Sequence, residues 1–147
     1  MHLAYGRTCS QRQRSEADAL RYALDLGIQL IDTAEMYGEG GAGVIGEAIQ
    51  GRRADAVIVS KVYPLCFPRG SRCLRRHSLR RPGTDVIDLY HCCTGAAFAG
   101  RNVQNARLRD AGKIRDFGVS GFDYDDLQEV AELGIGTFGC QRCSTLV

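Results

Sequence analysis

The fold is decided by the stretch Ile28-Gln29-Leu30-Ile31-Asp32-Thr33-Ala34-Glu35-Met36-Tyr37-Gly38. Its apolar first half, which ends in Asp32 before a Gly-rich turn, predicts a buried strand of a parallel sheet. In βα folds the active site lies at the C-terminal ends of such strands, so Asp32 and Tyr37 are candidates for catalysis. The structural alternative is that Asp32 caps the next helix and Tyr37 packs under a loop.

Helix and strand patterns alternate along the rest of the chain. Ser15 to Asp18 resembles a capping box that opens a helix, and Gly27 is suited to end it. Gly38 to Gly43 is expected to be a flexible loop. The other predicted elements are a helix at 44–49, strands at 56–61, 86–90 and 116–120, a helix end at 107–114 that Gly112 closes, and a last helix that Asp123 caps. Strands separated by helices predict an α/β fold with a parallel sheet of four βα units.

Length, composition and charge limit the function. A chain of 147 residues is expected to form one domain, residues 1–147, and 44% hydrophobic content is ordinary for a soluble protein. A net charge of +2 is too small to indicate nucleic acid or an anionic membrane as a partner. We expect a cytoplasmic protein, because we find no apolar run of membrane-spanning length and no signal peptide.

Seven cysteines allow a metal-binding alternative. Cys140 and Cys143 form a C-x-x-C pair, and His91, Cys92 and Cys93 offer further soft ligands. A zinc site could be drawn from these residues, but a single C-x-x-C without a second pair is a weak signal and adjacent cysteines chelate poorly. We therefore expect no metal.

Four stretches resemble the aldo-keto reductase family. They are Leu26 to Gly38 (LGIQLIDTAEMYG), Ile58 to Val62 (IVSKV), Leu79 to Tyr90 (LRRPGTDVIDLY) and Ala111 to Ser120 (AGKIRDFGVS). The stretches follow the order of the family and cover most of Arg14 to Leu133. The resemblance implies a TIM barrel whose members reduce carbonyl groups with NADPH, sometimes NADH, and without a metal.

The resemblance also implies the catalytic residues. Tyr37 matches the general acid that protonates the carbonyl oxygen as hydride reaches the carbon. A phenol with an ordinary pKa near ~10 donates poorly at neutral pH, and a nearby cation lowers that pKa. Lys61, at the end of the second predicted strand, matches this cation, and Asp32 matches the residue that pairs with it. Asp32 and Ser120 are expected to contact the cofactor.

Two positions depart from the family pattern. The family histidine falls at position 93, where this chain has Cys93, and the nearest histidine, His91, comes two residues earlier. His91 has the same strand parity but would lie about 6–7 Å deeper in the barrel, too far from Tyr37 unless the strand slips. A buried or loop histidine is the alternative. Gly121 replaces the asparagine that follows Ser120 in the family, where both residues hold the nicotinamide carboxamide.

Length is a third departure, because a (β/α)8 barrel takes roughly 250 residues. We therefore expect a partial barrel of about the first half, without the later strands that carry most phosphate contacts of the cofactor. Three stretches, Leu65–His77, His91–Asn105 and Gly134–Val147, show no pattern, and six of the seven cysteines lie in or beside them. A shifted reading frame with permitted codons restores family-like residues there, including Leu-Leu-His-Trp after Tyr90, so a truncated and partly frameshifted copy is our hypothesis.

Two functions remain open on this basis. The first is reduction of an aldehyde or ketone, a small-molecule substrate, by hydride from NADPH. The second is a catalytically inactive fragment that binds nucleotide weakly or has a structural role. The open strand edges of a half barrel can also support self-association.

Overall fold

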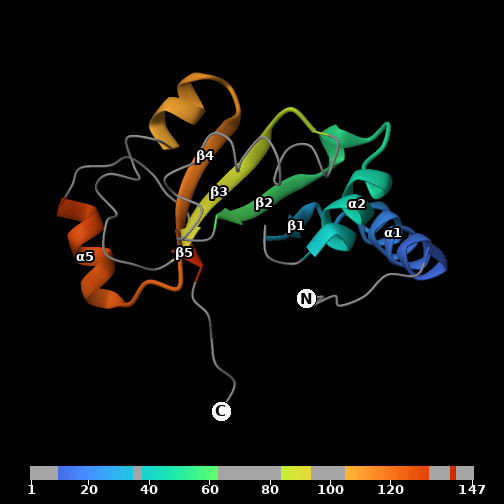
Figure 1. Cartoon of the computed structure of the whole chain (residues 1–147), viewed down its shortest axis with the longest axis horizontal. Coiled ribbons are helices and arrows are strands. Elements are labelled where there is room, and N and C mark those ends of the chain that lie inside the picture. Colours follow the sequence, from blue (N-terminus) through green and yellow to red (C-terminus); the bar gives the residue numbers. More distant parts are fainter. Residues whose placement is uncertain (1–9, 35–37, 63–83, 94–104, 133–139, 142–147) are drawn as a thin grey trace, which may run out of the picture.

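Five strands form a single parallel sheet in the computed structural model, which describes residues 10–34, 38–62, 84–93, 105–132 and 140–141. The strands pair in the order of the chain (Figure 1). They are β1 (Leu30–Asp32), β2 (Val57–Val62), β3 (Ile87–Cys93), β4 (Ile114–Ser120) and β5 (Cys140–Gln141). The helices are α1 (Ser10–Asp25), α2 (Gly38–Ala48) and α5 (Tyr124–Glu132), with the 3-10 helix η2 (Arg53–Asp55) and a helical stretch at 105–110. The predicted α/β fold with a parallel sheet is confirmed, and β5 adds a strand to the four that were expected.

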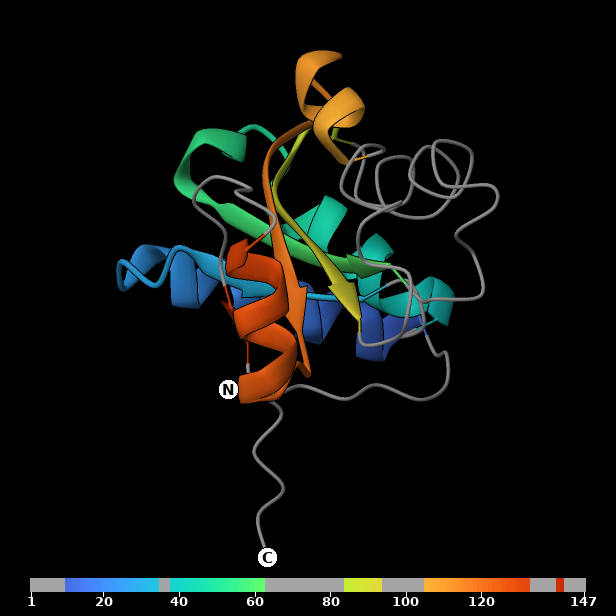
Figure 2. The same cartoon turned by 90° about the vertical axis from the view of Figure 1, so that its left-hand side faces the viewer.

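The helices α1, α2 and α5 pack on one face of the sheet, which we call the outer face. Ile31 of β1 and Ile58 of β2 are register partners and share a buried cluster with α1 and α2. Val119 of β4 packs with Val130 of α5. Figures 1 and 2 place α1 and α2 together at the β1–β2 end of the sheet and α5 at the β4–β5 end. Because side chains alternate along a strand, the residues between these point to the opposite, inner face.

The glycine-rich segment 38–43 is helical, which corrects the expected flexible loop. Glycine costs about 1 kcal/mol per position in a helix relative to alanine. Packing against α1 compensates, because Val44 and Ala48 cluster with Ala17, while Ile45 and Ile49 join the core beneath. Tertiary burial therefore decides the conformation of α2 where local propensity opposes it.

Two glycines end helices directly before strands, as the sequence indicates. Gly27 has φ +83°, its N–H bonds the Leu24 carbonyl, and the Ile28 N–H bonds the Ala23 carbonyl. Gly112, with φ +65°, repeats both bonds at the end of the 105–110 helix. This Schellman arrangement needs a left-handed residue, which glycine adopts without a Cβ penalty.

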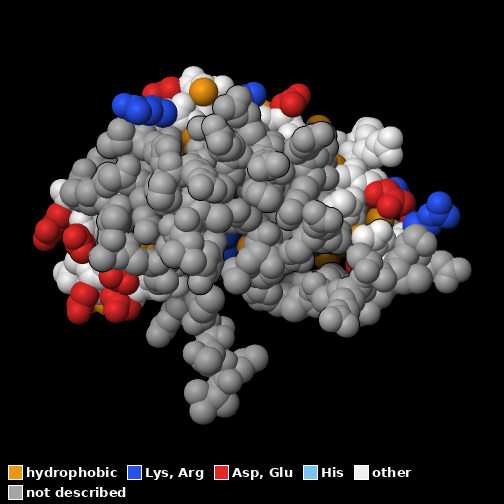
Figure 3. Space-filling view, in the orientation of Figure 1, with side chains coloured by type: hydrophobic (Ala, Val, Ile, Leu, Met, Phe, Trp, Pro, Cys, Tyr) orange, Lys and Arg blue, Asp and Glu red, His pale blue; other side chains and the backbone are white. Residues whose placement is uncertain are grey.

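The cap of the last helix is also confirmed. Asp123 Oδ1 accepts the Asp126 N–H at 2.9 Å, and Asp126 Oδ2 accepts the Asp123 N–H at 3.1 Å. The remaining surface of α5 is acidic, as the red side chains at the left of Figure 3 show.

In the described residues, no helix combines the length and hydropathy that crossing a membrane requires.

Several predicted boundaries were wrong. Helix α1 is already formed at Ser10, so Ser15 to Asp18 lies inside it and is not its cap. Strand β3 continues through His91 to Cys93, because it pairs with β2 on one side and β4 on the other along this length. Residues 140–141, expected to be part of a loop and tail, pair with the end of β4. The irregular stretch 63–77 lies outside the described residues.

Candidate functional site

The candidate site lies on the inner face at the C-terminal ends of the strands. An ion pair between the buried Lys61 and the partly buried Asp32 occupies its β1–β2 part. Lys61 Nζ lies 2.5 Å from Asp32 Oδ1 and 2.6 Å from Asp32 Oδ2, and it also donates to the Thr33 carbonyl at 3.3 Å. The two side chains are 9% and 22% exposed. The structure therefore brings together two of the residues that the sequence singled out.

The register of the β1–β2 ladder produces this contact. Asp32 is the register partner of Val59, and Lys61 lies two residues further along the same face of β2. The long lysine side chain spans this diagonal step to the neighbouring strand. The bidentate approach to both carboxylate oxygens fixes the ammonium group in place.

His91 lies one step below the strand ends. It is the register partner of Lys61 on β2 and of Gly118 on β4, and it is 3% exposed. Cys93, the last residue of β3, is the register partner of Ser120. Position 93 therefore reaches the end of the strand, whereas His91 stays two residues deeper, about 6–7 Å along β3.

Ser120 ends β4 and is buried. Its register partner on the far side is Gln141 of β5. The strand position of Gln141 was not predicted, because two strand residues carry no periodicity and the surrounding stretch resembles a tail. Only the rule that a strand follows each helix of a βα fold could have indicated a strand after α5.

Tyr37 lies outside the described residues, as do Cys9, Cys66, Cys73 and Cys143. In the part of the chain that the structure describes, no three side chains of His, Cys, Asp or Glu are grouped so that they could hold a metal ion.

Comparison with known proteins assigns the family. The sequence profile of the Aldo/keto reductase family matches residues 2–140. The chain belongs to the aldo-keto reductase family, whose members are oxidoreductases that use NADP(H). It is 43% identical over 145 residues to the methylglyoxal reductase YeaE of Escherichia coli (strain K12), covering 95% of this chain and 49% of the relative. It is 35% identical to the aldo-keto reductase YhdN of Bacillus subtilis (strain 168), covering 78% and 39%.

Solved structures of the family agree with the fold. An aldo-keto reductase from Klebsiella pneumoniae, crystallised in complex with NADPH, superposes with a TM-score of 0.79 at 38% identity. The match covers 84% of this chain and 45% of that protein. The chain thus spans about half the length of the relatives it matches, and its sheet corresponds to the first half of their TIM barrel.

Removing one partner of the Asp32–Lys61 pair should destabilise the fold. Replacing Asp32 with Ala leaves the buried Lys61 ammonium without its carboxylate, and we expect the free energy of unfolding to fall by about 3 kcal/mol in urea titrations. The matched control is Asp18→Ala, which removes the exposed Asp18–Arg21 pair and should change stability by less than about 0.5 kcal/mol. Equal effects of the two substitutions would contradict this account.

Proposed function

We propose that this chain carries the carbonyl-reducing site of an aldo-keto reductase, with an aldehyde or ketone as substrate and Tyr37 as general acid. The observation that carries the proposal is the ion pair of the buried Lys61 with Asp32 at the C-terminal ends of β1 and β2. A lysine at this position places a charge on the face that a barrel encloses, where desolvation is costly. A role in chemistry accounts for such a charge better than a role in packing does. Residues 1–147 act as one domain in this proposal, in the cytoplasm.

The proposed chemistry divides among three side chains. Tyr37 donates a proton to the carbonyl oxygen of the substrate. The proposal assigns to the Lys61 ammonium the role of a cation beside the phenol, because a neighbouring positive charge favours the phenolate and so makes proton donation easier. Asp32 holds the ammonium by two short contacts and keeps it from swinging away. When bound, NADPH supplies the hydride that adds to the carbonyl carbon.

The end of β4 fits the nicotinamide end of the cofactor. The buried Ser120 hydroxyl both donates and accepts hydrogen bonds, as a carboxamide partner must. Gly121 beside it has φ +76°, a left-handed conformation that asparagine tolerates better than most residues. The backbone is therefore suited to the asparagine of the family pattern, and its loss removes one contact. We expect NADPH to bind weakly.

The residue at position 93 is relevant to the choice between an active enzyme and an inactive remnant. The family pattern has histidine there, and this chain has Cys93 at the end of β3 while His91 stays deeper. Without an imidazole at the strand end, Tyr37 alone orients the carbonyl. Slow turnover is expected, and complete absence of turnover would favour the non-catalytic alternative.

Tyr37→Phe tests the proposed acid. Removal of the phenolic proton should lower NADPH oxidation with methylglyoxal, followed by absorbance, at least about 100-fold. NADPH affinity, followed by fluorescence titration, should change little because the ring remains. Tyr22→Phe on the exposed surface of α1 is the control and should keep full activity. A Tyr37→Phe protein as active as the unmodified chain would exclude Tyr37 as the acid.

Cys93→His tests the missing imidazole. The substitution introduces histidine in the row of Ser120 and should raise kcat/KM at least about tenfold, a part of the roughly 100-fold or more that a well-placed acid–base group contributes. Cys92→His is the matched control, because position 92 pairs with Val119 instead, and it should give no gain. Equal rates for both variants would show that the strand-end position does not matter.

We also propose that two copies of this chain associate through their sheet edges. Leu30 on the edge strand β1 and Val57 beside it belong to the inner face, yet they are 61% and 40% exposed. A twofold axis along the strands preserves strand direction, so β5 of one copy can lie parallel to β1 of the other. The two outer edges of the sheet, as far as the structure describes it, are then paired, and both apolar side chains are covered.

Leu30→Glu tests this association. The unmodified chain should sediment as a dimer, and the charge at position 30 should weaken dimerisation at least about tenfold. Tyr124→Glu changes a similarly exposed apolar residue on α5 and should leave the dimer intact. A monomer at all concentrations would contradict the proposal.

A further inference from the structure

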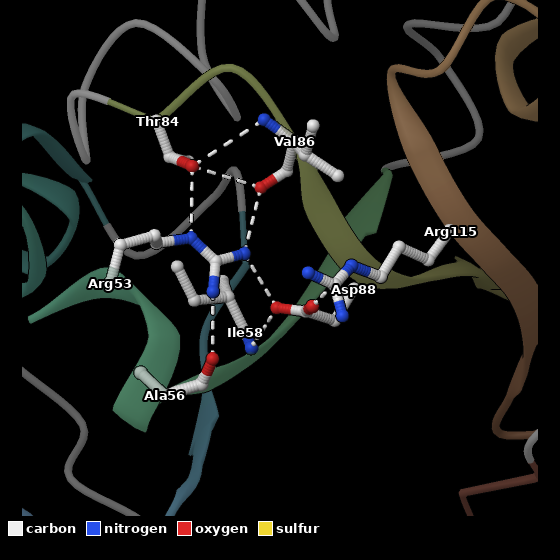
Figure 4. Close-up of polar contacts among 7 residues, drawn as sticks. All are labelled: Arg53, Ala56, Ile58, Thr84, Val86, Asp88 and Arg115. Atoms are coloured by element: carbon white, nitrogen blue, oxygen red, sulfur yellow. Dashed lines mark hydrogen bonds and ion pairs between the residues drawn. The ribbon is translucent and has the colours of Figure 1, made fainter.

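The carboxylate of Asp88 joins three elements on the outer face, at the opposite end of the strands from the candidate site. It is 9% exposed and lies at the start of β3 (Figure 4). Its Oδ2 accepts the Arg53 Nη2 at 2.6 Å and the Ile58 N–H at 2.8 Å. Its Oδ1 lies 3.1 Å from the Arg115 Nε.

The bond to Ile58 occupies the start of the β2–β3 ladder. The regular register of this ladder begins at Val59 and Leu89, one residue beyond Ile58 and Asp88. The Asp88 side chain thus satisfies a main-chain donor of β2 just before the strand pairing begins. This bond requires Asp88 to lie opposite Ile58, which is its position in the observed register.

Arg53 ties the beginnings of the same two strands together. Its guanidinium donates to the Ala56 carbonyl before β2 at 2.7 Å and to the Val86 carbonyl before β3 at 2.9 Å. Its Nε donates to Thr84 Oγ1 at 3.0 Å. The N–H groups of a guanidinium point in fixed directions. Arg53 can therefore donate to all of these acceptors only when they lie at this spacing.

Arg115 extends the cluster to β4. Ile87 and Ile114 are register partners, so Asp88 and Arg115 come next on the two strands. Arg115 is 72% exposed, whereas Arg53 is 30% exposed, so the contact of Asp88 with Arg115 is closer to solvent than its contact with Arg53. The three side chains, which we call the Asp88 cluster, hold the starts of β2, β3 and β4.

Such a cluster is needed because side-chain alternation alone does not fix the register. A slip of one residue would exchange the two faces and expose the core. A slip of two residues, about 6.6 Å, keeps each residue of β3 on its own face. In that slipped sheet His91 would take the row of Ser120, and Asp88 would leave Arg53.

We infer that the Asp88 cluster determines the register of β2, β3 and β4, and that Asp88 is thereby a positioning residue for the candidate site. It keeps Lys61 opposite His91 and Cys93 opposite Ser120. The catalytic consequence rests on the proposed function, whereas the register itself does not.

Nuclear Overhauser contacts across the strands test the register directly. The unmodified chain should show one set, joining Lys61 to His91 and Cys93 to Ser120. Asp88→Asn keeps the size of the side chain and an acceptor for Ile58 but loses the charge that both arginines face. It should add a second set that joins His91 to Ser120, and amides of β3 should exchange with solvent at least tenfold faster than in the unmodified chain.

Asp85→Asn is the matched control, because Asp85 is exposed on the same connection, and its contacts and exchange rates should stay within twofold of the unmodified chain. If the Asp88→Asn protein does not fold, Arg115→Met is the second test of the register. It removes one of the two arginines that contact Asp88, and because Arg115 is exposed the variant should still fold. Faster exchange confined to β3 and β4 supports the inference. A single unmodified set of contacts with unchanged exchange overturns it, and so does a uniform loss of stability without a second register. Neither the Overhauser contacts nor the amide exchange rates depend on turnover, so they test the register even if the proposed function is wrong.

Discussion

The parallel pairing of β2 with β3 is the constraint on which the rest of the structure depends. It places Lys61 beside His91 on the inner face and Ile58 beside Asp88 on the outer face. Because side chains alternate, one register sends apolar residues to the helices and polar residues to the candidate site. A change in this one ladder would therefore alter the core and the site together.

Ion pairs that each include one buried side chain hold the sheet at both ends and on both faces. The Asp32–Lys61 pair lies at the C-terminal ends on the inner face, and the Asp88 cluster lies at the N-terminal ends on the outer face. Desolvation makes such contacts a weak source of net stability, but breaking one is costly. Each contact joins side chains from particular positions on neighbouring strands and therefore also depends on how those strands are aligned.

The sequence predicts those features that depend on one residue and its neighbours. Gly27, Gly112 and Asp123 end or begin helices as their chemistry requires, and these positions were correct. The Asp32–Lys61 contact was also foreseen, from the resemblance of the stretches around both residues to the family pattern. The family profile then agreed with the resemblance of four short stretches.

The features that were missed depend on distant partners. The glycine-rich start of α2 becomes helical because α1 packs against the helix, and no local pattern reports that contact. Strand β3 extends to Cys93 because β4 pairs with it, and β5 is a strand only through its bonds to β4. The Asp88 cluster joins residues from three segments far apart in the sequence, so their meeting requires the folded sheet.

The adjacency of β1 and β2 has a consequence for recombination. Asp32 and Lys61 are supplied by neighbouring strands within the first 62 residues, and their contact uses no side chain from a later strand. Genetic exchange after β2 can therefore replace the segments that follow β3 and β4 while the lysine–aspartate pair is inherited as a unit. The pair and the segments after β3 and β4 can then diversify on separate pieces of the gene.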